Sequence, residues 1–256
     1  MKPYIKLFFT LLIPLVIVVV YASIQFEIPG ICKADISKYR FHSPEIDSLP
    51  ADIDTSMIIV EPEPASVDTA KQRILFFGDS MLEGLSKRFS DYAKKNGHEL
   101  KSVIWYSSST VIWANSDTLD HFIKQVDPTL IITCLGSNEL FVRDLPARDK
   151  AIKGILEKIG DTPFVWIGPP NWRKDTGIDS LILENVGEKR FFDSSHLTLE
   201  RGGDHAHPTF AAASRWMDTI AVWMSDCTLT AHAIVMDFPE FTGSENDCTL
   251  LAPLKK

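Results

Sequence analysis

Short apolar runs alternate with amphipathic stretches over most of the chain after residue 70. The runs typical of strands are RILFF (73–77), ELKSVIWY (99–106), TLIITCL (129–135), PFVWI (163–167) and a short one at 190–192. The stretches typical of helices are 86–95, 117–126, 147–159 and 208–224, the last with apolar residues spaced for one helix face. Short buried strands that alternate with helices predict an α/β domain around a mainly parallel sheet.

The beginning of the chain has a different pattern. Residues 7–24 (LFFTLLIPLVIVVVYASI) carry no charge, and a helix of that length spans roughly 27 Å, the thickness of a hydrocarbon core. The nearest positive charges, Lys2 and Lys6, precede this run, which favours a cytoplasmic amino end and an exported remainder. We therefore expect residues 1–26 to form a transmembrane anchor. The alternatives are cleavage after Ala22, which would release a secreted protein, and a buried core helix.

The rest of the chain divides by composition. Residues 27–70 are rich in proline and contain the acidic stretch EPEP, which predicts an extended spacer. Residues 71–226 hold the alternating pattern and form the expected α/β domain, and residues 227–256 form a C-terminal tail. The domain is thus expected on the outer side of the membrane, in a periplasmic or extracellular location.

The cysteines matter because the domain is expected to be exported. Cys227 and Cys248 flank the tail, and a disulfide between them would close a loop of about twenty residues. Cys134 lies inside an apolar run and is expected to be a buried thiol. Cys32 has no evident partner, and the sequence alone does not fix the pairing.

Charge and composition exclude several classes of function. Acidic residues outnumber basic ones by 34 to 26, which gives a net charge of −8, and no cluster of Lys and Arg favours nucleic acid. The hydrophobic fraction of 45% excludes wholesale disorder. No HExxH motif occurs, and the single HxH at 205–207 has no further ligand cluster nearby, so we expect neither a metal nor a cofactor.

Polar side chains follow the ends of the predicted strands. Residues 78–80 (GDS) follow the first strand, residues 136–139 (GSNE) follow the third, and residues 204–208 (DHAHP) precede the last helix. Chemistry in parallel sheets gathers at the carboxyl ends of strands. A serine, a histidine, a carboxylate and an amide donor are the parts needed for acyl transfer through a serine nucleophile.

These motifs resemble those of the SGNH hydrolases, also called GDSL-type esterases and lipases, over residues 73–224. From FFGDSMLEGL the resemblance implies that Ser80 is the nucleophile, and from LGSNEL that Asn138 donates to the oxyanion. From DHAHP it implies that His207 is the base and that Asp204 orients it. The fold implied is a flavodoxin-like three-layer α/β/α sandwich.

The chain departs from the family pattern in two places. The second block normally supplies a glycine N–H to the oxyanion, whereas this chain has YSSST at 106–110. The N–H of Ser108 or of Ser109 is the candidate replacement. The third block has Glu139 where the family usually has aspartate, at a position that is mostly structural.

A second Asp-x-x-His sequence precedes the motif that we assign to the base. It runs from Asp193 to His196. We favour the later pair because Pro208 follows it directly, where a long amphipathic helix begins, and a proline in the first helical turn fixes the start of a helix.

The predicted function is that of an exported, membrane-tethered serine esterase. An O-acetyl ester on a cell-envelope glycan is the leading substrate class, chosen by analogy. Trp113, Trp166 and Trp172 are candidates either for aromatic surfaces near the pocket or for core residues. The alternatives are an O-acyltransferase that is supplied by a membrane partner and passes the acyl group to a glycan hydroxyl, and a catalytically silent glycan-binding protein.

Overall fold

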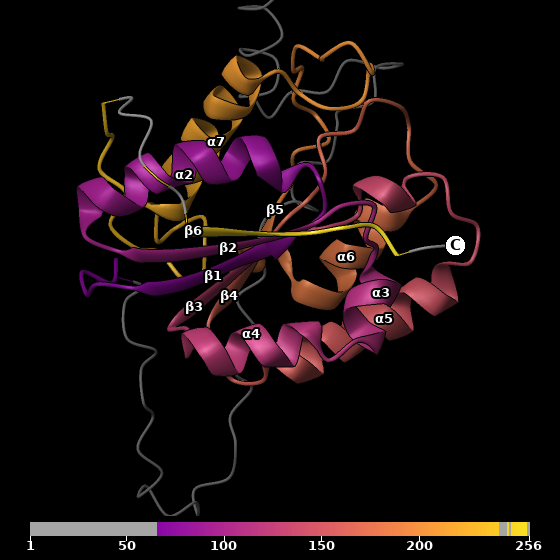
Figure 1. The fold of residues 1–256 in the computed structure, drawn as a ribbon, viewed down its shortest axis with the longest axis horizontal. Coiled ribbons are helices and arrows are strands. Elements are labelled where there is room, and N and C mark those ends of the chain that lie inside the picture. Colours follow the sequence, from indigo (N-terminus) through magenta and orange to yellow (C-terminus); the bar gives the residue numbers. More distant parts are fainter. Residues whose placement is uncertain (1–65, 241–244, 246, 255–256) are drawn as a thin grey trace, which may run out of the picture. The chain divides into compact units, whose positions relative to one another are not determined.

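The computed structural model describes residues 66–240, 245 and 247–254, and Figure 1 shows their arrangement. The chain divides into two units, Met1–Glu61 and Pro62–Lys256, and all described residues belong to the second. That unit contains a six-stranded sheet in the order β5-β4-β3-β1-β2-β6, in which every neighbouring pair is parallel. The strands are β1 (Arg73–Gly78), β2 (Glu99–Trp105), β3 (Leu130–Cys134), β4 (Phe164–Ile167), β5 (Phe191–Phe192) and β6 (Asp247–Leu251).

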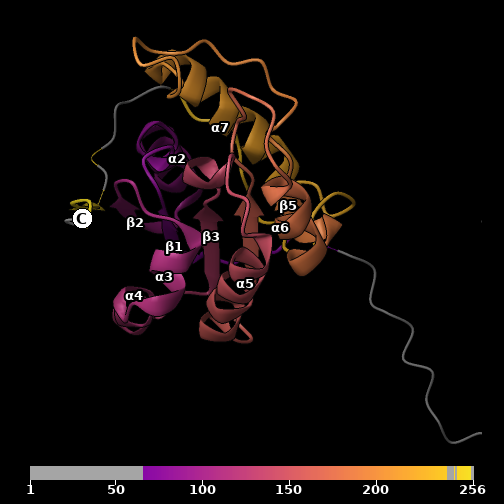
Figure 2. The ribbon, with the colours of Figure 1, turned by 90° about the vertical axis from the view of Figure 1, so that its right-hand side faces the viewer.

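Helices cover both faces of the sheet. The α-helices of the described residues are α2 (Leu82–Asn96), α3 (Thr110–Asn115), α4 (Thr118–Val126), α5 (Leu145–Ile159), α6 (Ile178–Val186) and α7 (Phe210–Met224). Helices α2 and α7 pack on one face, and α3 to α6 pack on the other (Figures 1 and 2). The predicted α/β architecture with a parallel sheet is confirmed.

Strand β1 shows why its sequence is apolar throughout. Ile74 and Phe76 point into the core beneath α2 and α7, whereas Leu75 and Phe77 point into the core beneath α3 to α6. All four side chains are fully buried. A central parallel strand has both faces covered, so a continuous apolar run replaces the alternation of a half-exposed strand.

Several element assignments differ from the sequence prediction. Helix α2 begins at Leu82, four residues before the predicted start, so it follows the GDS turn directly. Helices α3 and α6 were not predicted, because six and nine residues are few for a helical period to show. Strand β6 lies in the predicted C-terminal tail, yet it pairs with β2, from Lys101 opposite Asp247 to Trp105 opposite Leu251. The sequence DCTLL carries no strand pattern of its own, because an edge strand needs to bury little of its surface.

The cysteines are only partly as predicted. Cys134 is a buried thiol, as expected, and burial raises its pKa. Cys227 and Cys248 are free thiols, so the disulfide considered between them is absent from the structure. Cys248 is held in β6 opposite Ser102 of β2, whereas Cys227 follows the end of α7.

The predictions for the beginning of the chain concern residues outside the described ones. These are the apolar run 7–24 with its cleavage site, Cys32 and most of the spacer 27–70. Within the part of the chain that the structure describes, no helix has the length and apolar character needed to cross a bilayer.

Candidate active site

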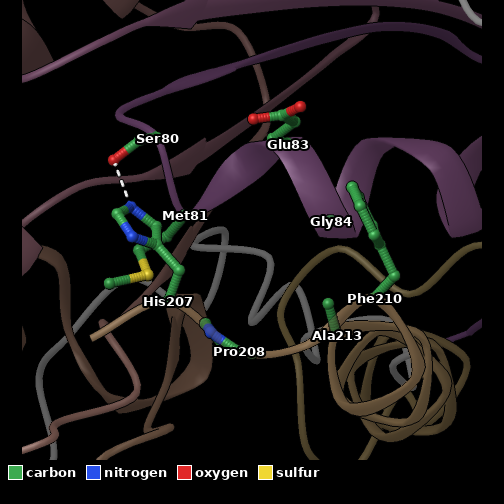
Figure 3. Close-up of a pocket in the computed structure, with 8 residues that line it drawn as sticks. All are labelled: Ser80, Met81, Glu83, Gly84, His207, Pro208, Phe210 and Ala213. Carbon is green, nitrogen blue, oxygen red and sulfur yellow. Dashed lines mark hydrogen bonds between the residues drawn. The ribbon is translucent and has the colours of Figure 1, made fainter. Parts of the chain in front are cut away.

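Ser80, His207 and Asp204 meet at the carboxyl edge of the sheet. Ser80 lies between β1 and α2, and its Oγ is 2.8 Å from Nε2 of His207 (Figure 3). On the other side of the imidazole, Nδ1 is 2.5 Å from Oδ2 of Asp204. A proton on Nδ1 is held by the carboxylate, which leaves Nε2 free to accept the serine proton. The structure therefore brings together the three residues predicted from the sequence, with the imidazole in the middle.

The turn that presents Ser80 depends on close packing against β3. A Cβ added at Gly78 would lie 2.2 Å from the carbonyl oxygen of Cys134, so only glycine fits there. Asp79 is fully buried, and its Oδ1 accepts a hydrogen bond from the N–H of Met81 at 2.9 Å. Its Oδ2 accepts one from the hydroxyl of Ser137. Asp79 thus fixes the turn and links it to the loop after β3.

Burial of Asp79 has an electrostatic consequence. Loss of hydration is the largest influence, and it raises the pKa of this carboxyl to about 6. The hydrogen bonds from Ser137 and Met81 oppose the shift but do not cancel it. A group that titrates near neutrality therefore lies one residue from the candidate nucleophile.

Backbone contacts between the two ends of the loop that carries His207 hold this loop together. The N–H of Gly202 donates to the carbonyl of His207 at 2.8 Å, and Arg201 forms an antiparallel bridge with Pro208. Oδ1 of Asp204 accepts hydrogen bonds from the N–H groups of Ala206 and His207, both at 3.0 Å. These bonds and the contact with the imidazole hold the pKa of Asp204 well below its usual range. Asp204 is therefore fixed as an anion beside the histidine.

The helix after this loop begins slightly later than predicted. Helix α7 starts at Phe210, and Thr209 caps it by accepting a hydrogen bond from the N–H of Ala212 at 3.2 Å. Pro208 precedes the cap instead of lying in the first turn. The rigid helix end still lies directly after His207, which was the reason for preferring this pair.

Arg201 is a positioning residue that the sequence reading missed. Its guanidinium donates to the carbonyl of Ala206 at 2.7 Å and to the carbonyl of Pro170 at 2.8 Å. It thereby joins the histidine loop to the loop after β4. The only signal in the sequence was an arginine just before DHAHP. An arginine that is merely exposed on the surface would look the same in the sequence.

Asn138 joins the loop after β3 to the loop after β2. Its Nδ2 donates to the carbonyl of Ser108 at 2.9 Å, and a side-chain amide has a second N–H available for a ligand. Ser108 is buried, its N–H donates to the carbonyl of Trp105 at 3.1 Å, and its Oγ accepts from Nε1 of Trp113 at 2.9 Å. Its N–H is therefore already occupied.

Ser109 is the remaining candidate from the second block. Its side chain caps α3 by accepting from the N–H of Ile112 at 3.4 Å. Among the described residues, no acceptor is found for the N–H of Ser109. Of the two N–H groups that the sequence left as candidates, that of Ser108 is thus hydrogen-bonded within the described residues and that of Ser109 is not.

Glu139, for which the sequence predicted a mostly structural position, is a buried connection between two loops. It accepts from the N–H of Thr110 at 2.9 Å and from its hydroxyl at 2.7 Å, and it lies 2.7 Å from Nε of Arg148. Burial raises its pKa, although these partners oppose the shift. The longer side chain thus holds the start of α3 against the loop that carries Asn138.

The rival histidine, His196, makes no hydrogen bond to Ser80 in the described residues, and it does not line the pocket beside that serine. His196 Nδ1 lies 3.8 Å from Asp193, and both side chains are largely exposed. Of the three tryptophans considered for the pocket, Trp113 and Trp166 are fully buried core residues. Trp172 is only partly buried and packs edge-on against the exposed Phe141, with ring centroids 6.2 Å apart.

A pocket of about 180 Å³ adjoins the serine and the histidine (Figure 3). It is lined by Ser80, Met81, Glu83, Gly84, His207, Pro208, Phe210 and Ala213. Its walls come from the first turns of α2 and α7 and from the histidine loop. In the described residues, no group of three or more His, Cys, Asp or Glu side chains is arranged to hold a metal ion.

Comparisons with protein-family models and with curated proteins found no relative of this chain. No protein-family model matches the chain, and no curated protein matches it. The arguments about function therefore rest on the motifs and on the geometry of the site.

Proposed function

We propose that the protein is a serine esterase of the SGNH type, which hydrolyses an acyl ester through Ser80, His207 and Asp204. The observation that carries the proposal is the hydrogen-bonded series of the three side chains, with 2.8 Å from serine to imidazole and 2.5 Å from imidazole to carboxylate. The strand order β2-β1-β3-β4-β5 supports it, because this is the order of flavodoxin-like sheets. On this proposal β6 is an addition at the β2 edge of a flavodoxin-like three-layer sandwich.

The proposed reaction has two halves. Nε2 of His207 takes the proton of Ser80 while Oγ attacks the acyl carbonyl, and the imidazolium is stabilised by Asp204. The negative oxygen of the tetrahedral intermediate accepts from Nδ2 of Asn138 and from the N–H groups of Ser80 and Ser109. His207 then gives its proton to the departing alcohol, which leaves an acyl-enzyme. In the second half a water molecule takes the place of the alcohol. His207 accepts a proton from this water as it attacks the acyl-enzyme, and then returns the proton to Oγ of Ser80 as the acid leaves.

Exposure of the reacting groups favours hydrolysis over transfer. The side chain of His207 is 43% exposed to solvent, and that of Asp204 is 52% exposed. Water therefore reaches the imidazole without an opening step, and an acyl-enzyme formed here would meet water first. Acyl transfer to a glycan hydroxyl stays the alternative, and it requires an acceptor that outcompetes this water.

The proposed substrate and location follow from the site and the beginning of the chain. The acyl group that we propose is a short one, acetyl, by analogy with other esterases that act on glycans. The charge-free run at 7–24 leads us to propose a membrane tether and an extracytoplasmic domain. O-acetyl esters on a cell-envelope glycan are the substrate class that such a tethered enzyme would meet.

The test is the esterase activity of the full-length protein, purified in mild detergent, on p-nitrophenyl acetate and on an acetylated glycan. Ser80→Ala should lower kcat/KM by about 10³-fold or more, because the nucleophile is lost while binding remains. Ser180→Ala, an exposed serine of α6, is the matched control and should have no effect. Equal rates for the wild type and Ser80→Ala would refute the proposal. Acyl transfer to an added sugar without hydrolysis would replace it with the transferase.

A further inference from the structure

We infer that the pocket beside Ser80 and His207 binds the alcohol part of the ester as a single uncharged sugar ring, and that Glu83 and Phe210 determine this specificity. The inference rests on the proposed function and names the part of the substrate that this pocket takes.

The position of the pocket assigns it to the alcohol. Both Ser80 and His207 line it, whereas Asn138 does not. In the proposed reaction His207 must deliver a proton to the departing oxygen, so the alcohol has to lie on the imidazole side of the serine. Of the proposed oxyanion donors, neither Asn138 nor Ser109 lines the pocket. A pocket that contains the imidazole but neither of these two donors is therefore placed for the alcohol.

The volume of the pocket limits the alcohol to about one ring. A cavity of about 150 Å³ is known to hold one benzene molecule, and this pocket measures about 180 Å³. The contact between α2 and α7 limits its extent, because a Cβ added at Gly84 would lie 2.4 Å from Cβ of Ala213. The two helices are therefore in close contact at Gly84 and Ala213, which line this pocket.

Glu83 makes the pocket suitable for hydroxyl groups. It lies in the first turn of α2, and its Oε2 accepts a hydrogen bond from the phenol of Tyr106 at 3.0 Å. This bond holds the carboxylate in place and leaves Oε1 as an acceptor. An ionised carboxylate only accepts hydrogen bonds, so it favours hydroxyl donors and repels acidic groups. It also disfavours purely apolar alcohols, which would remove water from it without replacing the hydrogen bonds.

Phe210 supplies an aromatic surface to the same pocket. It is the first residue of α7, and 57% of its surface is exposed although it lines the pocket (Figure 3). Nζ of Lys87 lies 4.1 Å from the ring centroid, which holds the ring in place through a cation–π contact. A sugar ring has C–H groups on its faces and hydroxyls at its edge, so it matches a pocket whose lining holds both an aromatic ring and a carboxylate.

The test compares two acetate esters with the full-length protein: a mono-O-acetyl methyl glucopyranoside and n-hexyl acetate. The wild type should favour the sugar ester. Glu83→Gln keeps the shape of the side chain but removes its charge, and it should lower the ratio of kcat/KM for sugar ester to kcat/KM for hexyl ester about tenfold. Phe210→Ala should lower the same ratio. Glu157→Gln, an exposed residue of α5, is the control and should leave both rates unchanged.

A third variant and a third substrate make the result specific to the proposed contacts. Tyr106→Phe removes only the bond that fixes Glu83, so the ratio should fall by less than in Glu83→Gln. The acetylated methyl glucuronoside should react more slowly than the glucoside in the wild type, and Glu83→Gln should reduce that difference. Ser80-dependent activity whose ratio is the same in the wild type, Glu83→Gln and Phe210→Ala overturns this inference and leaves the esterase proposal standing. Activity that does not depend on Ser80 overturns the esterase proposal and this inference with it.

Discussion

The buried carboxyl of Asp79 should make the domain more stable in acid than in mild alkali. The side chain has no exposed surface, and burial raises its pKa to about 6 from an ordinary value of 3.8. Between these two values the folded protein holds a proton that the unfolded chain has released. Stability therefore falls as the pH rises through this window.

The size of the effect follows from the shift in pKa. A shift of one pKa unit is worth 1.36 kcal/mol, so a shift of about two units costs about 3 kcal/mol once the group is ionised in both states. Asp79→Asn removes this cost, because an amide cannot ionise. The amide oxygen can still accept from the N–H of Met81, and the hydroxyl of Ser137 can accept from the amide N–H. We therefore expect the variant to be more stable than the wild type at pH 8, by up to about 3 kcal/mol.

The assay is thermal unfolding of the full-length protein from pH 4 to pH 8, followed by tryptophan fluorescence. A gain of about 3 kcal/mol corresponds to roughly 6–12 °C in Tm for a domain of this size. The difference between Asp79→Asn and the wild type should be present at pH 8 and shrink toward zero at pH 4. Asp161→Asn, an exposed aspartate, is the control and should follow the wild type. A Tm for Asp79→Asn that is lower at pH 8 than the wild type, with an unchanged pH dependence, would refute the reasoning.

Two further predictions concern the loops around the site. Gly78→Ala places a methyl group against the carbonyl of Cys134, where a Cβ would lie only 2.2 Å away, so the free energy of unfolding should fall by about 1–3 kcal/mol. Denaturant titration measures this, and Gly203→Ala, whose Cβ would meet nothing within 4 Å, should be near neutral; equal losses in the two variants would contradict the packing argument. Arg201→Met removes three side-chain hydrogen bonds, to the carbonyls of Ala206, Pro170 and Asn171, so on the proposed function kcat should fall about tenfold or more with little change in KM. Steady-state kinetics with unfolding curves as a control would test it, and a stable variant with full kcat would show that Arg201 does not position His207.

Most of the fold could be predicted from local pattern. The central strands are buried on both faces, so their apolar runs are unmistakable, and alternation with amphipathic helices leaves few arrangements other than a parallel sheet. The GDS, GSNE and DHAHP segments could be found for the same reason, because each lies at the end of a predicted strand or before a strongly periodic helix. Helix α3 and strand β6 could not, since six residues show no helical period and DCTLL gains its strand conformation from pairing with β2.

The sequence by itself determined the architecture of the sheet, the three segments that meet at its edge and the pairing of Asp204 with His207, because side-chain period and short-range spacing are local properties. Only the tertiary structure showed that His207 contacts Ser80, that the N–H of Ser108 is hydrogen-bonded to Trp105, and which of the tryptophans lie in the core. It also revealed Arg201 and the pocket between α2 and α7. These depend on the contacts between segments that are far apart in the chain, and a distance between such segments is fixed only when the whole core packs.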